Sequence, residues 1–373
     1  MLARAAGLLD ERVVEGQIGC HSVLRVRLHI TLHKEAAHRE SGGVGSRPAG
    51  LSSWLQLARG KPVRELSWLL ATRGLWLVVL EITVVSFGWA FTVPWPLFLQ
   101  VIWAIGWSMI ALAPLVWAPR AAVLAVGVAI VCGHNLLDPI APGRLGAAAW
   151  LWTLLHEGGV LRVGGPPIGF AAYPVLPWIG VMALGYGLGA IFVEPARVRD
   201  RKLGRIGVAM LVAFVVLRAL NVVGDARPWT VQGSAVATAM SFLDVTKYPP
   251  SLLYVLVTLG LVLSLWPVIA RLPRFVTNEL AVFGAVPFFF YVIHIYVVHA
   301  AAVVANAAAG RDPSGLFGYF ENGHTAPERI AGLGFSLPVV YVATVAVVAL
   351  LYPLCRWWGD VKRTRRHWAL SYL

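Results

Sequence analysis

Charged residues are scarce in this sequence, and acidic residues are the scarcest. Of 373 residues, 18 are Asp or Glu and 31 are Lys or Arg, so that charged residues make up only 13%. A soluble globular domain carries about 25% charged and about 45–50% apolar residues. Here 58% of the residues are hydrophobic, and the 16 Trp residues favour membrane interfaces. This excess excludes a soluble enzyme and predicts an integral membrane protein of several spans.

Cysteine is rare as well, with only Cys20, Cys132 and Cys355, which are far apart and lack metal-ligand spacing. No disulfide framework follows from them. The sequence also has no G-x-x-x-x-G-K-[ST], H-E-x-x-H or G-x-S-x-G motif, and His156 is followed by Glu157 without a second His at metal spacing. We therefore predict no metal site and no permanently bound cofactor.

The net charge of +13 is spread in a way that argues against nucleic acid as a partner. The Lys and Arg residues form short clusters between apolar runs and give no continuous basic face. Such clusters set membrane orientation and contact anionic lipid headgroups. The lipid bilayer is the predicted partner.

The first 50 residues differ from the rest of the chain. They contain Arg, Glu and His throughout and show no secretory signal pattern. Crossing a bilayer takes about 20 apolar residues, and no apolar run in this segment is that long. We predict a disordered polar segment over residues 1–50 and a membrane domain over residues 51–373.

Eight apolar segments of the membrane domain are long enough to be membrane helices. Lipid offers no partners for unpaired backbone groups, so each segment is predicted to be helical and the fold to be an all-α polytopic bundle. The predicted spans are residues 68–91, 97–118, 121–138, 168–193, 205–223, 250–270, 281–305 and 335–355.

The Lys and Arg residues near the span ends differ strongly between the two sides. One side collects Arg59, Lys61, Arg64, Arg120, Arg197, Arg199, Arg201, Lys202, Arg205, Arg271, Arg274, Lys362, Arg363, Arg365 and Arg366. The other side has Arg144, Arg162, Arg227, Lys247, Arg311 and Arg329, spread over longer loops. The positive-inside rule then predicts eight spans with both termini cytoplasmic, in the inner or plasma membrane.

Polar residues at membrane depth are costly and are candidates for function. Several fall at one level, near the predicted outer side: Trp178, Arg218, Asn221, Asp225, Lys247 and Tyr248, with Tyr291, His294 and His299 in the span 281–305. Structural interpretations remain open beside the functional ones. Arg218 and Asp225 can form an ion pair at a helix end, Lys247 can extend to the interface, and Tyr291 can serve packing.

Two further groups of residues have mainly structural interpretations. His134 and Asn135 are predicted to cap the end of their span, and the glycines of the string GYGLGA (185–190) to allow close helix packing. Glu81 lies in the middle of the first span and has to be protonated or paired, because burial disfavours a lone carboxylate. Arg73 is too far along the helix to be its partner.

Six strings, at 72–89, 173–189, 217–225, 242–260, 283–299 and 355–373, together resemble a bacterial membrane family. It is the family named for the heparan-alpha-glucosaminide N-acetyltransferase catalytic domain. The resemblance covers about residues 50–373, and its most specific strings are KYPPSL (247–252) and VPFFFYVIH (286–294). It implies a multi-pass protein that moves an acetyl or other acyl group from acetyl-CoA, used from the cytoplasmic side, to a sugar-like acceptor across the bilayer.

The resemblance does not extend to the beginning of the family pattern. Members open with two further spans, an I-D-x-L-R-G string and a D-H pair that carries the reactive histidine, and nothing before Gly50 matches these. His21, His29, His33 and His38 lie in no recognisable motif and do not inherit the role. A frameshift or misplaced start would explain the boundary, and we expect the chain as given to insert in the membrane without transferring acyl groups.

Three functions follow from these observations. In a membrane acyltransferase, His294 or His299 would be the base, Lys247 and Arg218 would stabilise charge, and Asp225 would orient them. Trp178, Asn221, Tyr248 and Tyr291 would contact the acceptor. The alternatives are a carrier or channel with these residues along its path, and a non-catalytic membrane scaffold. Consumption of a CoA thioester without solute flux distinguishes the first from the others.

The orientation can be tested with single cysteines at positions 200 and 320. The Lys and Arg asymmetry puts position 200 in the cytoplasm and position 320 outside. A membrane-impermeant maleimide should label Phe320→Cys in intact cells and Asp200→Cys only after permeabilisation. Labelling of position 200 in intact cells would contradict the orientation.

Overall fold

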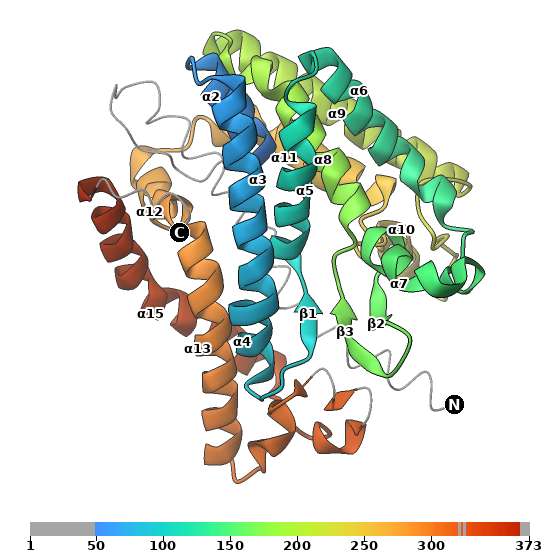
Figure 1. Cartoon of the computed structure of the whole chain (residues 1–373), viewed down its shortest axis with the longest axis vertical. Coiled ribbons are helices and arrows are strands. Elements are labelled where there is room, and N and C mark those ends of the chain that lie inside the picture. The colour runs from blue at the N-terminus through green and yellow to red at the C-terminus, as the bar shows by residue number, and fades with distance from the viewer. Residues whose placement is uncertain (1–48, 320–321, 324–325, 366–373) are drawn as a thin grey trace.

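Long apolar helices dominate the computed structural model, which describes residues 49–365 apart from 320–321 and 324–325 (Figure 1). The predicted polar segment 1–50 lies almost wholly outside the described residues. The helices and helical turns are α2 Ala49–Ala58, α3 Val63–Leu80, η1 Glu81–Val85, α4 Ser86–Ala90, α5 Val101–Leu115, α6 Arg120–Gly133, η2 His134–Leu137, η3 Pro142–Ala148, α7 Ala149–Trp152, η4 Thr153–Glu157, α8 Val175–Gly187, η5 Leu188–Val193, α9 Ala196–Leu220, α10 Ala235–Leu243, α11 Leu252–Ile269, α12 Arg274–Ala285, α13 Pro287–Ala308, η6 Pro313–Leu316, η7 Pro327–Arg329 and α15 Leu337–Thr364.

Seven continuous helical segments among the described residues are long and apolar enough to cross a membrane. They are Val63–Ala90, Arg120–Leu137, Val175–Val193, Ala196–Leu220, Leu252–Ile269, Pro287–Ala308 and Leu337–Thr364. Each matches one of the eight predicted spans, so the predicted multi-pass helical architecture is confirmed. The protein is an integral multi-pass membrane protein.

The remaining predicted span, 97–118, contains a shorter helix than expected. Helix α5 has 15 residues, or about 22 Å at 1.5 Å per residue, which is less than a bilayer core of ~30 Å. Strand β1, Leu97–Leu99, leads directly into it and adds about 10 Å of extended chain. A strand and a helix in series therefore cover the distance that a single helix was expected to cover.

A small sheet corrects the expectation that every apolar segment is helical. Strand β3, Pro167–Ala171, pairs in parallel with β1 and antiparallel with β2, Gly159–Arg162, in the order β1-β3-β2. These residues include the predicted start of the span 168–193. Pairing provides partners for the backbone of the central strand β3 on both sides, and Leu99, Leu161 and Ala171 are buried.

The predicted span 281–305 is divided by a break in the helix. Helix α12 ends at Ala285, Val286 takes a non-helical conformation, and α13 begins at Pro287. Proline has no backbone N–H and disfavours helical geometry in the preceding residue, so the break falls where the sequence requires it.

Glycine residues allow the neighbouring helices to approach closely. A Cβ atom on Gly106 of α5 would lie 2.7 Å from the carbonyl oxygen of Gly74 of α3, and one on Gly207 of α9 would lie 2.1 Å from the backbone nitrogen of Ser264 in α11. Small residues at helix contacts are characteristic of membrane bundles. The expected packing role of GYGLGA is confirmed for Gly187 against Leu124 and for Gly189 against Trp54.

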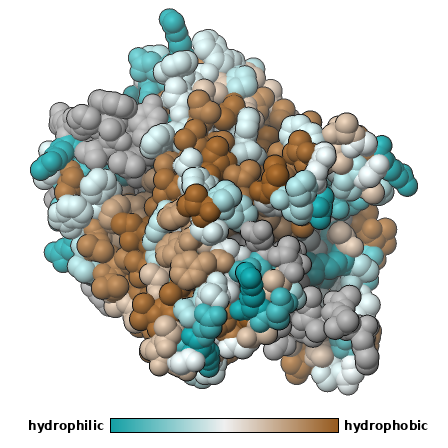
Figure 2. All heavy atoms as spheres, turned by 60° about the horizontal axis from the view of Figure 1, so that its bottom comes forward, coloured by the Kyte–Doolittle hydropathy of each residue, from teal (hydrophilic) through white to brown (hydrophobic). Residues whose placement is uncertain are grey.

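Apolar side chains also cover much of the surface. Figure 2 shows broad hydrophobic areas between polar side chains on the face that includes the lower end of Figure 1. On α15 the exposed residues include Leu337, Tyr341, Val342, Val345 and Leu350. On the surface of a membrane protein, exposed apolar side chains such as these contact lipid and not water.

The glycine contact between α3 and α5 predicts a strong effect of one methyl group. Gly106→Ala should lower the free energy of unfolding by about 1–3 kcal/mol, the usual cost of overpacking, because backbone atoms of α3 block the new Cβ. Thermal unfolding in detergent measures this. Gly185→Ala in α8 is the control, since its Cβ would meet nothing closer than 3.5 Å. Equal stability of the two variants would contradict the packing argument.

Candidate functional site

Arg218, on the last turn of α9, is 2% exposed and organises the segment that follows the helix. Its guanidinium donates hydrogen bonds to the backbone carbonyls of Arg227 at 2.8 Å, Phe242 at 3.0 Å and Ser241 at 3.1 Å, and also to that of Asp244. The planar fork of arginine suits several acceptors at once. Arg218 thus satisfies carbonyl groups of a segment that is neither helix nor strand over much of its length.

Asp225 has a similar role a few residues later. Its carboxylate accepts from the backbone N–H of Thr246 at 2.7 Å, the hydroxyl of Thr246 at 2.6 Å, the hydroxyl of Ser251 at 2.7 Å and the backbone N–H of Arg227 at 2.9 Å. Asn221 ends α9 in a left-handed conformation and exchanges two hydrogen bonds with the backbone of Trp229. Arg218 and Asp225 therefore both bind the backbone of the segment that follows α9, Arg218 through its carbonyls and Asp225 through its N–H groups. The contacts found for the two side chains are these, and not the ion pair that the sequence suggested.

Tyr248 is the centre of a group of aromatic side chains from several elements, which we call the aromatic group: Tyr173, Trp178, Tyr248 and Tyr291. The hydroxyls of Tyr173 and Tyr248 are 3.1 Å apart, and the rings of Tyr173 and Trp178 are 5.5 Å apart. The Lys247 ammonium lies 5.1 Å from the centre of the Tyr248 ring, within cation–π range. Burial, and next the neighbouring Tyr173, raise the pKa of Tyr248, so its phenol is a hydrogen-bond donor near neutral pH.

Tyr291 connects the aromatic group to a buried carboxyl group. Its hydroxyl donates to the side-chain oxygen of Gln100 at 3.3 Å, and the backbone N–H of Gln100 donates to Oε1 of Glu81 at 2.7 Å. Glu81 is fully buried, and its partner is a backbone N–H at the start of α5. The structure thereby supplies a partner that the sequence did not identify.

The two histidines of α13 lie in different surroundings. Nδ1 of His294 donates to the carbonyl of Phe290 at 3.1 Å, and the ring is 5.8 Å from that of Tyr291. The ring of His299 stacks on Phe91 at 4.0 Å, and its Nδ1 lies 3.2 Å from the carbonyl of Gly88. Only His294 is next to a member of the aromatic group.

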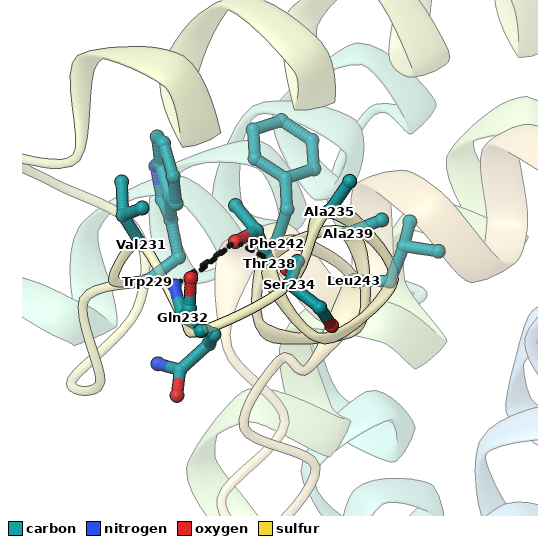
Figure 3. A pocket seen from close by; sticks show the side chains of 10 residues that line it. Trp229, Val231, Gln232, Ser234, Ala235, Thr238, Ala239, Phe242 and Leu243 are labelled. Atoms are coloured by element: carbon teal, nitrogen blue, oxygen red, sulfur yellow. Dashed lines mark hydrogen bonds between the residues drawn. The ribbon is translucent and has the colours of Figure 1, made fainter.

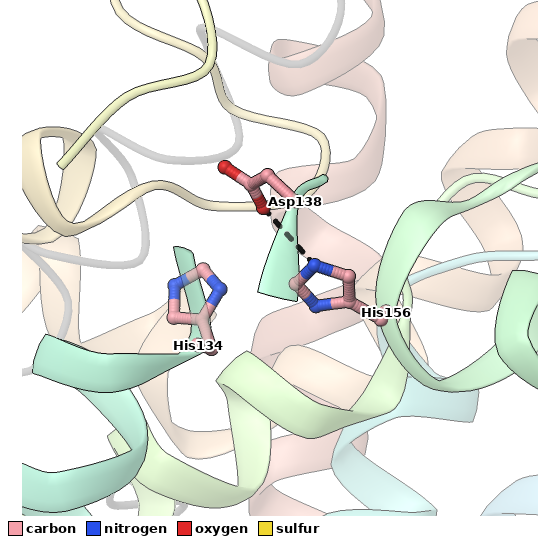
Figure 4. Close-up of side chains that lie close together, drawn as sticks. All are labelled: His134, Asp138 and His156. Atoms are coloured by element: carbon pink, nitrogen blue, oxygen red, sulfur yellow. Dashed lines mark hydrogen bonds and ion pairs between the residues drawn. The ribbon is translucent and has the colours of Figure 1, made fainter. Parts of the chain in front are cut away.

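His134, Asp138 and His156 form a cluster that was not expected from the sequence. Nε2 of His156 lies 3.0 Å from Oδ1 of Asp138, and the rings of His134 and His156 are 5.8 Å apart (Figure 4). Burial alone would raise the pKa of Asp138, but hydrogen bonds from His156 and Asn135 hold it below its ordinary value. His134 and Asp138 are four residues apart at the end of a helix, and this spacing indicates that they lie on the same face of the helix. Nothing in the sequence linked them to His156.

An open apolar hollow of about 790 Å³ lies beside α10 (Figure 3). It is bordered by Trp229, Val231, Thr238, Phe242 and Leu243, among others. None of the predicted site residues lines it. The hollow is formed by the same segment whose carbonyls Arg218 binds.

Comparison with known proteins finds one family model that matches part of this bundle. Residues 48–223 match the family model described as heparan-alpha-glucosaminide N-acetyltransferase, catalytic. The resemblance is thereby confirmed over these residues. No curated protein and no solved structure matches the chain.

The family match divides the candidate residues into two sets. Trp178, Arg218 and Asn221 lie within the range that matches the acetyltransferase family, as do His134, Asp138 and His156. The others lie beyond it, namely Asp225, Lys247, Tyr248, Tyr291, His294 and His299. The aromatic group joins the two sets, because Tyr173 and Trp178 belong to the matched range and Tyr248 and Tyr291 do not.

The role of Arg218 can be tested with a conservative substitution. Arg218→Lys should lower the free energy of unfolding by at least about 2 kcal/mol, because a single ammonium cannot reach four carbonyls and buried acceptors stay unpaired. Arg205→Lys, at an exposed position of the same helix, is the control and should be near neutral. Unfolding in mixed micelles gives both values, and a neutral Arg218→Lys would refute the role.

Proposed function

We propose that the protein is a membrane-bound acyltransferase that uses acetyl-CoA as co-substrate and a sugar-like acceptor, and acts in the inner or plasma membrane. The match to the acetyltransferase family over residues 48–223 supports the reaction class. The aromatic group around Tyr248 is the observation that best supports an acceptor site, because aromatic faces and hydroxyl groups together suit a sugar. Lys247 and His294 are adjacent to this group.

The chemistry requires few groups from the protein. The acceptor amine or hydroxyl attacks the thioester carbonyl, a new C–N or C–O bond forms, the C–S bond breaks, and CoA leaves and takes up a proton. A base has to remove the proton of the nucleophile, and a positive group or N–H donor has to stabilise the oxyanion.

His294 is the better of the two α13 histidines for the base. Its Nδ1 proton is donated to the carbonyl of Phe290, so Nε2 carries the lone pair in the neutral ring. The ring also lies next to Tyr291. His299, which stacks on Phe91, is assigned to packing in this proposal.

Lys247 is assigned the stabilisation of charge on the acyl oxygen. Its ammonium lies over the ring of Tyr248, whose phenol is a donor. Arg218, Asn221 and Asp225 position this pair, because they bind the backbone of the segment that leads to it. Their contribution to catalysis is therefore indirect.

Reconstituted protein tests this proposal. Acetyl-CoA consumption and acetyl transfer to glucosamine are measured in proteoliposomes, for the 373-residue chain and for the chain extended by the two opening spans of a family member. The extended form should transfer acetyl groups, and the chain alone should bind acetyl-CoA. Solute flux without consumption of CoA thioester in either form would favour a carrier and refute the proposal.

Two substitutions test the site itself. In the extended form, Lys247→Ala and Tyr248→Phe should each lower acyl transfer by about 10²-fold or more, the usual effect of removing an oxyanion donor, with membrane insertion intact. Tyr341→Phe on the exposed face of α15 is the matched control and should have no effect. Unaltered transfer in Lys247→Ala would reduce this residue to an interfacial anchor.

A further inference from the structure

His134, Asp138 and His156 form a cluster with the donor atoms and spacing of a metal site. One possible ligand atom from each residue, a ring nitrogen or a carboxylate oxygen, lies within 4.8 Å of the other two. In a tetrahedral zinc site with bonds of about 2.0–2.2 Å, ligand atoms are about 3.4 Å apart. The distance of 3.0 Å between His156 and Asp138 is already close to this value, and small side-chain rotations would bring the third ligand into range.

The unpartnered nitrogens of His134 point to a missing ligand. His134 is 3% exposed, and His156 beside it is 2% exposed. Neither ring nitrogen of His134 makes a hydrogen bond to any residue that the structure describes. The Pro250 carbonyl approaches His134 without reaching hydrogen-bond geometry. Buried polar atoms are nearly always paired, so the cluster lacks a partner that a cation would provide.

The residues around the cluster hold its ligands in place, as the outer partners of metal sites do. The side-chain amide of Asn135 donates to Oδ2 of Asp138 at 3.0 Å, which fixes the carboxylate that faces His156. The ring of Trp152 lies 5.0 Å from that of His156. Figure 4 shows the two imidazoles on either side of one space, with the carboxylate of Asp138 above it.

We propose that His134, Asp138 and His156 bind one Zn²⁺ ion with a fourth position left for water. Two imidazoles and one carboxylate suit zinc, whereas Mg²⁺ and Ca²⁺ prefer oxygen ligands alone. The side chain of Asp138 is 24% exposed, so the ion can enter from that side. The site does not depend on the proposed acyl transfer, and it revises the expectation of a protein without metal.

The ion has a structural consequence because its ligands come from separate parts of the chain. His134 begins the 3₁₀ turn η2 after α6, Asp138 directly follows this turn, and His156 lies in the π-helical turn η4. Asn135 in turn accepts from the backbone N–H of Leu252 at 2.9 Å, at the start of α11. Bound zinc would therefore connect α6, the turn η4 and, through Asn135, α11, and its removal should lower the melting temperature.

The test is the metal content of the whole chain, purified in detergent without chelator and without a polyhistidine tag. Mass spectrometry of the metal should find about one zinc per chain. His134→Ala and Asp138→Asn should each reduce this at least about tenfold, and the matched control His299→Ala should retain it. 1,10-Phenanthroline should lower the melting temperature of the wild type but not that of His134→Ala.

Cobalt provides a readout that does not depend on whether a variant folds. Wild-type protein freed of zinc and loaded with Co²⁺ should show the intense visible absorption of a tetrahedral site. Less than about 0.1 zinc per wild-type chain, together with no saturable Co²⁺ spectrum, would overturn the proposal. Zinc retained by His134→Ala and Asp138→Asn would also overturn it, because the ion would then lie elsewhere.

Discussion

The hydrogen bonds of Arg218 and Asp225 to the backbone are the interactions on which the candidate site depends. Buried N–H and C=O groups outside regular helices and strands need partners within the protein. In the segment between α9 and α11, a guanidinium binds four carbonyls and a carboxylate binds two N–H groups. The first role of these two charged side chains is therefore structural.

The last part of that segment, residues 246–252, is fixed from three directions. Asp225 binds Thr246 and Ser251, Tyr173 binds the hydroxyl of Tyr248, and Asn135 binds the backbone N–H of Leu252. The three contacts come from the chain after α9, before α8 and after α6. The polar side chains of the string KYPPSL, those of Lys247, Tyr248 and Ser251, thus each have a neighbour in the structure.

The sequence predicted the helices well because membrane insertion imposes one simple requirement on each of them. A run of about 20 apolar residues can be read without knowing its neighbours. The sheet could not be predicted in this way, because β1, β2 and β3 are three to five residues long and are stable only through pairing with one another. The break at Val286 was marked by Pro287 in the sequence, but the apolar character on both sides concealed it.

The same difference between local and distant information applies to the candidate residues. The sequence shows that Lys247 and Tyr248 directly precede a span and that Tyr291 lies within one. It does not show the partners of Arg218, because these are backbone carbonyls 9 to 26 residues away. His156 lies 18 residues after Asp138, and no helix or strand periodicity relates the two positions, so the sequence does not predict their contact.

The His134 cluster and the aromatic group are connected through one short segment. Asn135 binds both Asp138 of the cluster and Leu252 at the start of α11, and Tyr248 of the aromatic group is four residues before Leu252. Because Asn135 makes both contacts, a metal ion that held Asp138 in place would also support the start of α11, and with it the residues just before it.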